Sequence, residues 1–274
     1  MAVEATDAGP AGFEEKWRAA QPEFGLGLAF VPAPARAARS AFACIVFELE
    51  QAAFATDGAE AAAAKLAWWG EEFGRMSVRQ AQHPLARVLQ DWPATAAVTP
   101  SAWYAVLAGA FAQREPEPCG DADALLAGYA ALYEPVAGVE AALFPGSGAG
   151  DNTRARALAR AVRECAALPD VLREGRLPLP LDLLAHHRLS RSDLDARKPA
   201  RTAALQEWFA ELARRLAALR PAGPVQAAAT STMAWRARRA ARAGEPLAAL
   251  HDLLERLPMR AALAAWRAAR GSGG

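Results

Sequence analysis

The segment AEAAAAKLAWWGEEFGRMS (residues 59–77) decides the fold class, because its apolar residues recur with the period of an α-helix. Leu66, Trp69, Phe73 and Met76 follow one another at steps of three and four, which places them on one helix face. Alanine, the strongest helix former, fills many of the other positions. Segments with the alternating pattern of a β-strand are nearly absent from the 274 residues. The sequence therefore predicts an all-α protein.

Further helices are predicted on both sides of this segment, separated by short turns rich in glycine and proline. Thr99 is expected to cap the helix of residues 99–114. In the helix of residues 121–144, Pro135 is expected to end or kink the chain, since proline removes a backbone hydrogen bond. The remaining helical segments are residues 151–168, 203–220, 228–244 and 258–270. Consecutive helices with short connections are typical of a helical bundle.

Composition sets broad limits on function. The chain has 31 Lys or Arg and 30 Asp or Glu, so its net charge indicates no partner. Residues 1–17 lack the apolar core of a signal peptide, and no run of about 18 apolar residues could span a membrane. The three cysteines are too widely spaced for a disulfide framework or a zinc site. His186 and His187 are adjacent, so on a helix they would point to different faces. These features predict a soluble, cytoplasmic protein.

Charge is unevenly distributed along the chain. From Arg201 onward there are 12 Arg or Lys and 5 Asp or Glu, a net charge of +7, and the preceding part has a net charge of −6. These basic residues either form a solvated helix face, pair with the acidic N-terminal part, or contact an anionic membrane surface. The residues expected at such a surface are Trp235, Arg236, Arg238, Arg239 and Arg242. Aromatic residues are not interleaved with these arginines, so nucleic acid is not an expected partner.

Several segments, in a shared order, resemble the squalene/phytoene synthase family. Residues 30–54, FVPAPARAARSAFACIVFELEQAAF, resemble the family's Leu-Pro, its arginine and the alanine-rich helix that leads into an aspartate-rich motif. The later matching segments are AAKLAWWGEEF (63–73), HPLARVL (83–89), YEPVAGVEAALF (133–144), AVRECAALPD (161–170), GRLPLPLDLLAHHRL (175–189) and AAWRAAR (264–270). Each segment is a weak signal alone, but their common order over more than 200 positions is specific.

The resemblance implies one domain over residues 1–274, an isoprenoid-synthase-like helical bundle around a central cavity, with disordered tails at residues 1–12 and 271–274. In active members of the family, two aspartate-rich motifs face each other across this cavity. They hold Mg²⁺, which binds the diphosphates of two prenyl substrates. Clustered cations are needed there because the diphosphate leaves as a highly charged anion.

The first motif departs from the family pattern. Where the family has Asp-Asp-x-x-Asp, residues 47–53 read FELEQAA and contain no aspartate. Glu48 and Glu50 are two positions apart, so on a helix they point roughly 160–200° apart and cannot chelate one ion together.

The second motif is also altered. Asp170 is retained, and Glu174 stands where the family's next aspartate would be. Pro169 replaces the arginine that usually precedes this aspartate, and a proline at that position is expected to bend the helix.

These departures predict a protein of isoprenoid metabolism that lacks the Mg²⁺-dependent prenyl transfer and needs no cofactor. Such a protein would bind a prenyl lipid or assist an unidentified partner protein, in the cytoplasm or peripherally on the inner face of a membrane.

Two other interpretations remain open. The first is an active prenyltransferase that condenses two prenyl diphosphates head to head with substituted ligands. The resemblance then implies that Asp170, Glu174, Glu48 and Glu50 supply ligands for Mg²⁺, and that Arg36 and Arg176 bind diphosphate. The second is a scaffold whose cavity has filled with alanine and leucine side chains.

Overall fold

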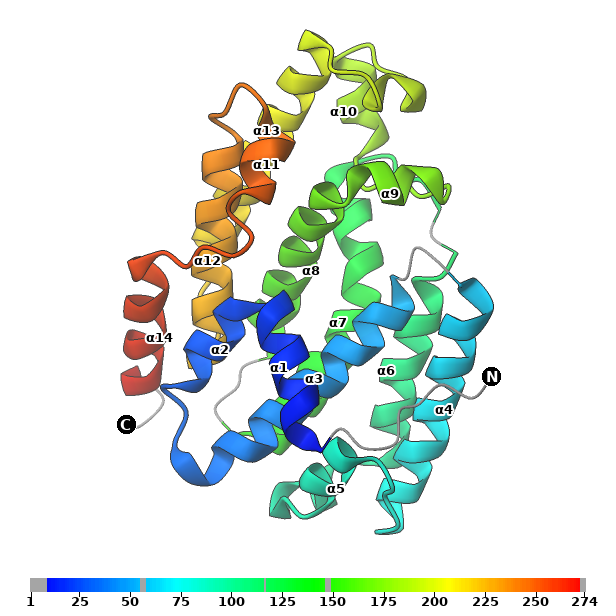
Figure 1. The fold of residues 1–274 in the computed structure, drawn as a ribbon, viewed down its shortest axis with the longest axis vertical. Helices are drawn as coiled ribbons and strands as arrows, with labels where there is room; N and C mark the ends of the chain where they lie inside the picture. The colour runs from blue at the N-terminus through cyan, green and yellow to red at the C-terminus, as the bar shows by residue number, and fades with distance from the viewer. Residues whose placement is uncertain (1–8, 55–57, 116, 146–148, 272–274) are drawn as a thin grey trace.

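The structure, a computed structural model, describes residues 9–54, 58–115, 117–145 and 149–271. These residues form α-helices and two short 3₁₀ helices and contain no β-strand, which confirms the all-α prediction (Figure 1). The elements are α1 (Pro10–Ala20), α2 (Pro22–Leu28), α3 (Ala33–Ala53), α4 (Ala59–Ser77), α5 (Pro84–Gln90), η1 (Pro93–Ala97), α6 (Pro100–Ala112), α7 (Ala122–Leu143), α8 (Ala149–Ala166), α9 (Leu168–Arg173), α10 (Leu181–His186), η2 (Arg191–Leu194), α11 (Pro199–Ala218), α12 (Pro224–Ala240), α13 (Pro246–His251) and α14 (Met259–Gly271).

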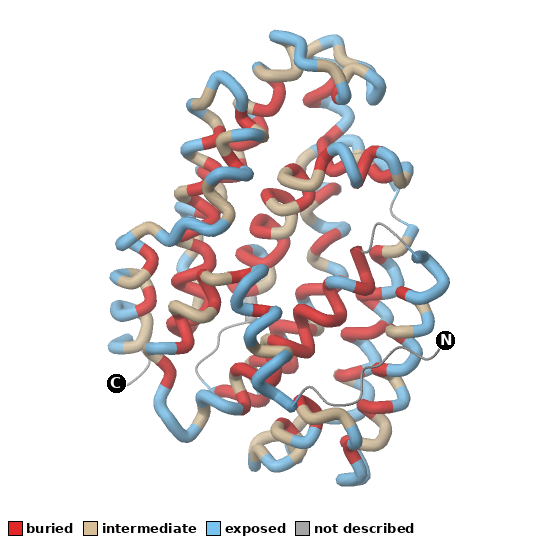
Figure 2. The backbone as a smooth tube through the Cα atoms, in the orientation of Figure 1, coloured by how far each residue is buried: buried red, intermediate tan, exposed pale blue. Residues whose placement is uncertain are grey.

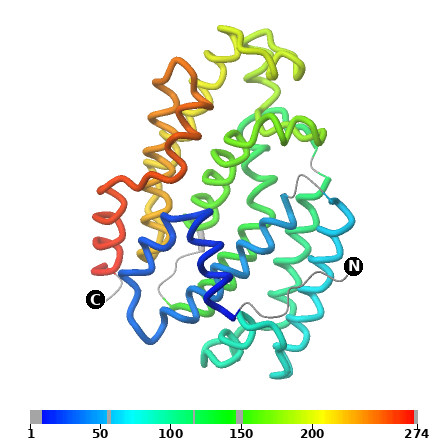
Figure 3. The backbone as a smooth tube through the Cα atoms, viewed as in Figure 1, coloured from blue at the N-terminus to red at the C-terminus, as the bar shows by residue number. Residues whose placement is uncertain are grey.

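The helices are arranged so that α3, α7 and α8 occupy the middle of the molecule (Figure 1). The chain passes from α4 and α6 on one side, through α7 and α8, to α11–α14 on the other side (Figure 3). Buried residues follow α3, α8 and α12 along most of their length (Figure 2). The buried apolar side chains form one continuous core that extends from Trp17 in α1 to Leu250 in α13.

Several local predictions are confirmed by the helix boundaries. The helix predicted over residues 59–77 is α4, and its apolar stripe, Leu66, Trp69, Phe73 and Met76, is buried. Thr99 caps α6, because its side-chain oxygen accepts a hydrogen bond from the backbone N–H of Ala102 at 3.3 Å.

Pro135 was predicted to end or kink the helix of residues 121–144. It does not end the helix, because α7 continues through Pro135 to Leu143. Proline leaves the carbonyl four residues earlier, that of Ala131, without its helical partner. At this point α6 packs closely on α7, since a Cβ added to Gly109 would lie 2.5 Å from the Ala131 carbonyl oxygen. Packing of α6 against the turn of α7 before the proline therefore supports the helix where this hydrogen bond is missing.

The predicted tails also need a correction. Residues 10–12 belong to α1 and Gly271 belongs to α14, so these positions are helical. Residues 1–8 and 272–274 lie outside the described part of the chain.

Candidate functional site

The interior between α2, α3, α7, α8 and α12 contains buried ion pairs. Glu23 of α2 is fully buried, and its carboxylate lies between two guanidinium groups. Nη2 of Arg163 in α8 is 2.7 Å from Glu23 Oε1, and Nη1 of Arg236 in α12 is 3.0 Å from Glu23 Oε2. One glutamate thereby joins three helices of the bundle.

Glu140 of α7 has a similar environment. Its carboxylate is 3.3 Å from Nη1 of Arg39 in α3 and 3.0 Å from Nη2 of Arg156 in α8. Burial lowers the pKa of Arg39, although the charge of Glu140 opposes this effect. The Glu140 carboxylate therefore compensates two cations that are otherwise largely removed from water.

Glu164 of α8 forms a third bridge. It pairs with Arg160 one turn earlier, and one of its oxygens lies 2.7 Å from Nη2 of Arg176. The guanidinium carbon of Arg160 is 3.7 Å from the centroid of the Phe54 ring, which is a cation–π contact. This contact lies at the C-terminal end of α3. Burial would lower the pKa of Arg160, but the nearby carboxylates of Glu164 and Glu50 outweigh it and raise this pKa.

The side chains of these ion pairs leave little free volume at the centre of the bundle. The space left between α2, α3, α8 and α12 has a volume of about 10 Å³, lined by Glu50, Arg156, Arg163, Gln226 and Thr230 among others. A volume of this size holds about one water molecule. Arginine and glutamate side chains occupy much of this centre beside three alanines, so it is not filled by alanine and leucine side chains alone.

The two glutamates of the first motif lie on different faces of α3, as their spacing predicts. Glu48 is 2.9 Å from Nζ of Lys16 in α1 and also pairs with Lys65 in α4. Burial would raise the pKa of Glu48, but the hydrogen bonds from Lys65 and Lys16 outweigh it and lower this pKa. Glu50 accepts a hydrogen bond at 3.1 Å from Nε2 of Gln21, the residue between α1 and α2.

The residues of the second motif lie on α9 and at its end. α8 ends at Ala166 and α9 begins at Leu168, so the expected bend at Pro169 coincides with a break between helices. Asp170 is exposed and pairs with Arg173 one turn away on the same helix. Glu174 follows the last residue of α9.

The four carboxylates are not assembled into a common metal site. In the described ranges, the group of three His, Cys, Asp or Glu side chains whose ligand atoms lie within 4.8 Å of one another is His186, His187 and Glu207. Because α10 ends at His186, the two histidine rings meet at a centroid distance of 4.9 Å and do not point to different faces as expected. Nε2 of His187, the residue after α10, lies 2.7 Å from the carboxylate of Glu207 in α11.

The two arginines expected to bind diphosphate are also separated. Arg36 is on the first turn of α3 and donates a hydrogen bond to the carbonyl of Val31 at 3.0 Å. The guanidinium carbon of Arg176 lies 5.8 Å from the ring of Phe54, which follows the last residue of α3. At 1.5 Å per residue, these ends of α3 are about 27 Å apart, so the two guanidinium groups cannot bind one diphosphate.

One residue of the expected membrane surface needs a correction. Arg236 is only 1% exposed and its guanidinium group pairs with Glu23, so it is not available to a surface. Trp235 and Arg238 are half-buried, whereas Arg239 and Arg242 are exposed.

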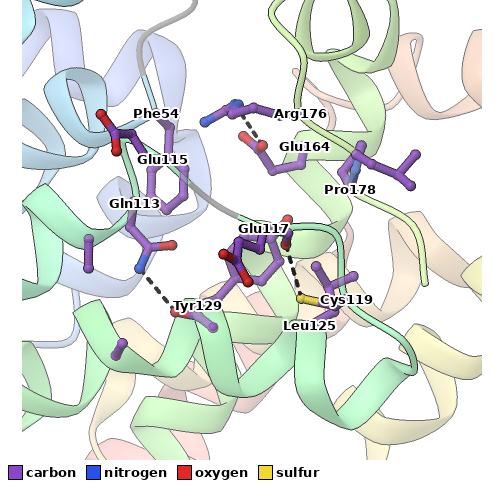
Figure 4. A pocket seen from close by; sticks show the side chains of 14 residues that line it. Phe54, Gln113, Glu115, Glu117, Cys119, Leu125, Tyr129, Glu164, Arg176 and Pro178 are labelled. Carbon is purple, nitrogen blue, oxygen red and sulfur yellow. Dashed lines mark hydrogen bonds and ion pairs between the residues drawn. The ribbon is translucent and has the colours of Figure 1, made fainter. Parts of the chain in front are cut away.

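A separate pocket of about 300 Å³ lies between the C-terminal ends of α3 and α6, the start of α7 and the chain after α9 (Figure 4). Its apolar wall includes Phe54, Leu125, Tyr129, Leu177 and Pro178. Its polar lining includes the carboxylates of Glu115, Glu117 and Glu164 and the guanidinium group of Arg176. Arg176 is already paired with Glu164 at 2.7 Å. Among these lining residues, Arg176 alone was predicted from the sequence to be a site residue.

Comparisons with known proteins agree with the geometry of the bundle. A family model described as squalene/phytoene synthase matches residues 17–270. The fold is similar to that of squalene synthase HpnC from Alicyclobacillus acidocaldarius, with a TM-score of 0.56 and 17% identity over 84% of this chain and 91% of that one. It is also similar to a dehydrosqualene synthase in complex with ligand, with a TM-score of 0.62 and 11% identity over 84% of each chain. No curated protein sequence matches this chain.

Proposed function

Because the chain belongs to the squalene/phytoene synthase family, we propose that it is an isoprenoid-binding accessory protein that has lost the metal-dependent transfer of prenyl groups. The observation that supports this proposal best is that three carboxylates of the two motifs already have partners within the protein. Glu48 is neutralised by two lysines, Glu50 is hydrogen-bonded inside the bundle, and Asp170 is paired with Arg173 at the surface.

The donor set does not fit a magnesium site. Mg²⁺ requires carboxylate oxygens in a near-octahedral arrangement and usually retains several waters. The motif carboxylates are dispersed among different partners, and the space beside Glu50 holds about one water. Each bridging glutamate inside the bundle already compensates two cations. These features favour a structural role for the interior charges over the binding of metal and diphosphate.

The pocket bounded by Phe54 and Leu125 is the proposed ligand site. Its volume of about 300 Å³ is at the lower end of the range for small-molecule sites. Its lining carries three carboxylates against a single arginine, and that arginine is already paired. An additional diphosphate would be repelled there, so the occupant we propose is a neutral isoprenoid such as a prenyl alcohol.

Binding of farnesol tests this site directly. We expect farnesol to displace a fluorescent farnesol analogue at least about tenfold more strongly than farnesyl diphosphate does. Leu125→Trp should abolish displacement because the indole fills the pocket. Leu126→Trp is the matched control, since Leu126 is the next residue of α7 and lines a different depression. Unfolding temperatures of both variants establish that they fold.

Two outcomes of this experiment would contradict the proposal. One is the absence of saturable farnesol binding, and the other is equal loss of binding in the Leu125 and Leu126 variants. Preferential binding of farnesyl diphosphate would favour the alternative of a substrate-binding enzyme.

We also propose peripheral contact with the inner face of a membrane, in keeping with apolar ligands of this class. Among the described helices, none combines the length and apolar character needed to cross a bilayer. Trp235, Arg238, Arg239 and Arg242 remain the surface predicted from the sequence.

A further inference from the structure

The C-terminal helix α14 has its small apolar residues inside and its large apolar residues outside. It packs against α12 and α2 at the edge of the molecule (Figure 1). Ala261 and Ala265 are fully buried, whereas Met259 is 91% exposed and Leu263 and Trp266 are each 44% exposed. Met259, Leu263 and Trp266 recur at steps of four and three, so they form one outward stripe. A helix that only covered the core would place these large side chains inward.

The charge around this stripe has one sign. Between Arg256 and Gly271 the chain has four arginines and no aspartate or glutamate. Arg256, Arg260, Arg267 and Arg270 are all exposed, and none of their guanidinium groups has an ion-pair partner within the described ranges. The guanidinium carbon of Arg270 lies 4.9 Å from the Trp266 ring centroid. The nearest acidic residues in the chain, Asp252 and Glu255, precede the helix.

An apolar stripe flanked by unpaired arginines is chemically suited to an anionic lipid surface. Apolar side chains enter the boundary between headgroups and acyl chains, and arginines extend toward the lipid phosphates. Tryptophan is enriched at this depth. A second copy of the same face would bring two sets of four arginines together, so charge repulsion disfavours a symmetric dimer.

We propose that α14 is the helix by which this protein binds an anionic membrane surface. This inference gives a site to the membrane contact proposed above and moves it from the end of α12 to α14. It rests on that proposed contact, but not on the binding of farnesol.

Vesicle co-sedimentation of the full chain tests the site. We expect binding to vesicles of phosphatidylglycerol and phosphatidylcholine at low salt, and little binding to phosphatidylcholine alone. Arg260→Gln with Arg267→Gln should weaken partition by about thirtyfold, the change expected for two basic residues at an anionic surface. Leu263→Gln with Trp266→Gln should also reduce partition, by at least about tenfold. The matched control, Arg238→Gln with Arg239→Gln, removes the same charge from α12 and should change partition less than threefold.

Each outcome of this experiment is decisive. If the α12 variant loses binding and the α14 variants keep it, the assignment to α14 is wrong and the surface predicted from sequence is supported. If the wild-type protein does not bind anionic vesicles, both the assignment and the proposed membrane contact are wrong. Unchanged unfolding temperatures in the variants ensure that a loss of binding is not a loss of folding.

Discussion

Replacement of Glu23 by glutamine should lower the free energy of unfolding by about 3–5 kcal/mol, the effect expected when one partner of a buried ion pair is removed. Glu23 is the carboxylate between Arg163 and Arg236, and the side chain of Arg236 is only 2% exposed. Glutamine has nearly the same shape but carries no charge, so both guanidinium groups would remain inside the bundle without compensation. A loss of this size is a large fraction of the total stability of a typical domain.

Asp91→Asn is the matched control for this experiment. Asp91 pairs with Arg79 at 3.5 Å, and both side chains are more than 70% exposed. Solvent screens such a pair, so the change in the free energy of unfolding should be below about 1 kcal/mol. Urea denaturation measures both variants. Equal and small effects would contradict the account of the charged interior.

The second large effect is expected where α6 crosses α7. A Cβ added to Gly109 would lie 2.5 Å from the carbonyl oxygen of Ala131 and 2.8 Å from the Cα of Leu132. Both atoms belong to the backbone, so the two helices would have to move apart. Gly109→Ala should therefore lower the free energy of unfolding by about 1–3 kcal/mol, as other overpacked cores do.

Gly138→Ala on α7 should have the opposite sign. Gly138 is inside the helix, and an added Cβ would have no atom within 4 Å. Alanine should raise the free energy of unfolding there by about 0.5–1 kcal/mol, because it restricts the unfolded chain and favours the helix. The same assay measures both variants. A stabilising Gly109→Ala would show that α6 and α7 are not in close contact.

Local patterns in the sequence predicted much of the fold. The apolar stripe of residues 59–77 gave the bounds of α4, and the cap at Thr99 was identified from a single side chain. Pro135 did not end α7, because a local rule does not include the packing of α6 against α7. The bend expected at Pro169 coincides with the break between α8 and α9, where the proline lies in the first turn of the new helix.

The charged interior was less accessible to sequence reasoning. Arg156, Arg160 and Arg163 recur at steps of four and three, so their common helix face was readable in the sequence. The carboxylates with which these arginines pair could not be identified from the sequence. Glu23 is 140 positions from Arg163 and 213 positions from Arg236, and only the packed bundle brings these side chains together. The arginine at position 236 was accordingly assigned to the surface, where the sequence shows a basic cluster but not its burial.

Product analysis with prenyl diphosphates tests the central claim that interior ion pairs have replaced the metal-dependent site. The purified protein would be incubated with farnesyl or geranylgeranyl diphosphate and Mg²⁺, and the extracted lipids examined for C30 or C40 products. An active dehydrosqualene synthase in the same buffer is the positive control. The account predicts no product above the protein-free background. A Mg²⁺-dependent C30 or C40 product that disappears in Asp170→Ala would contradict it.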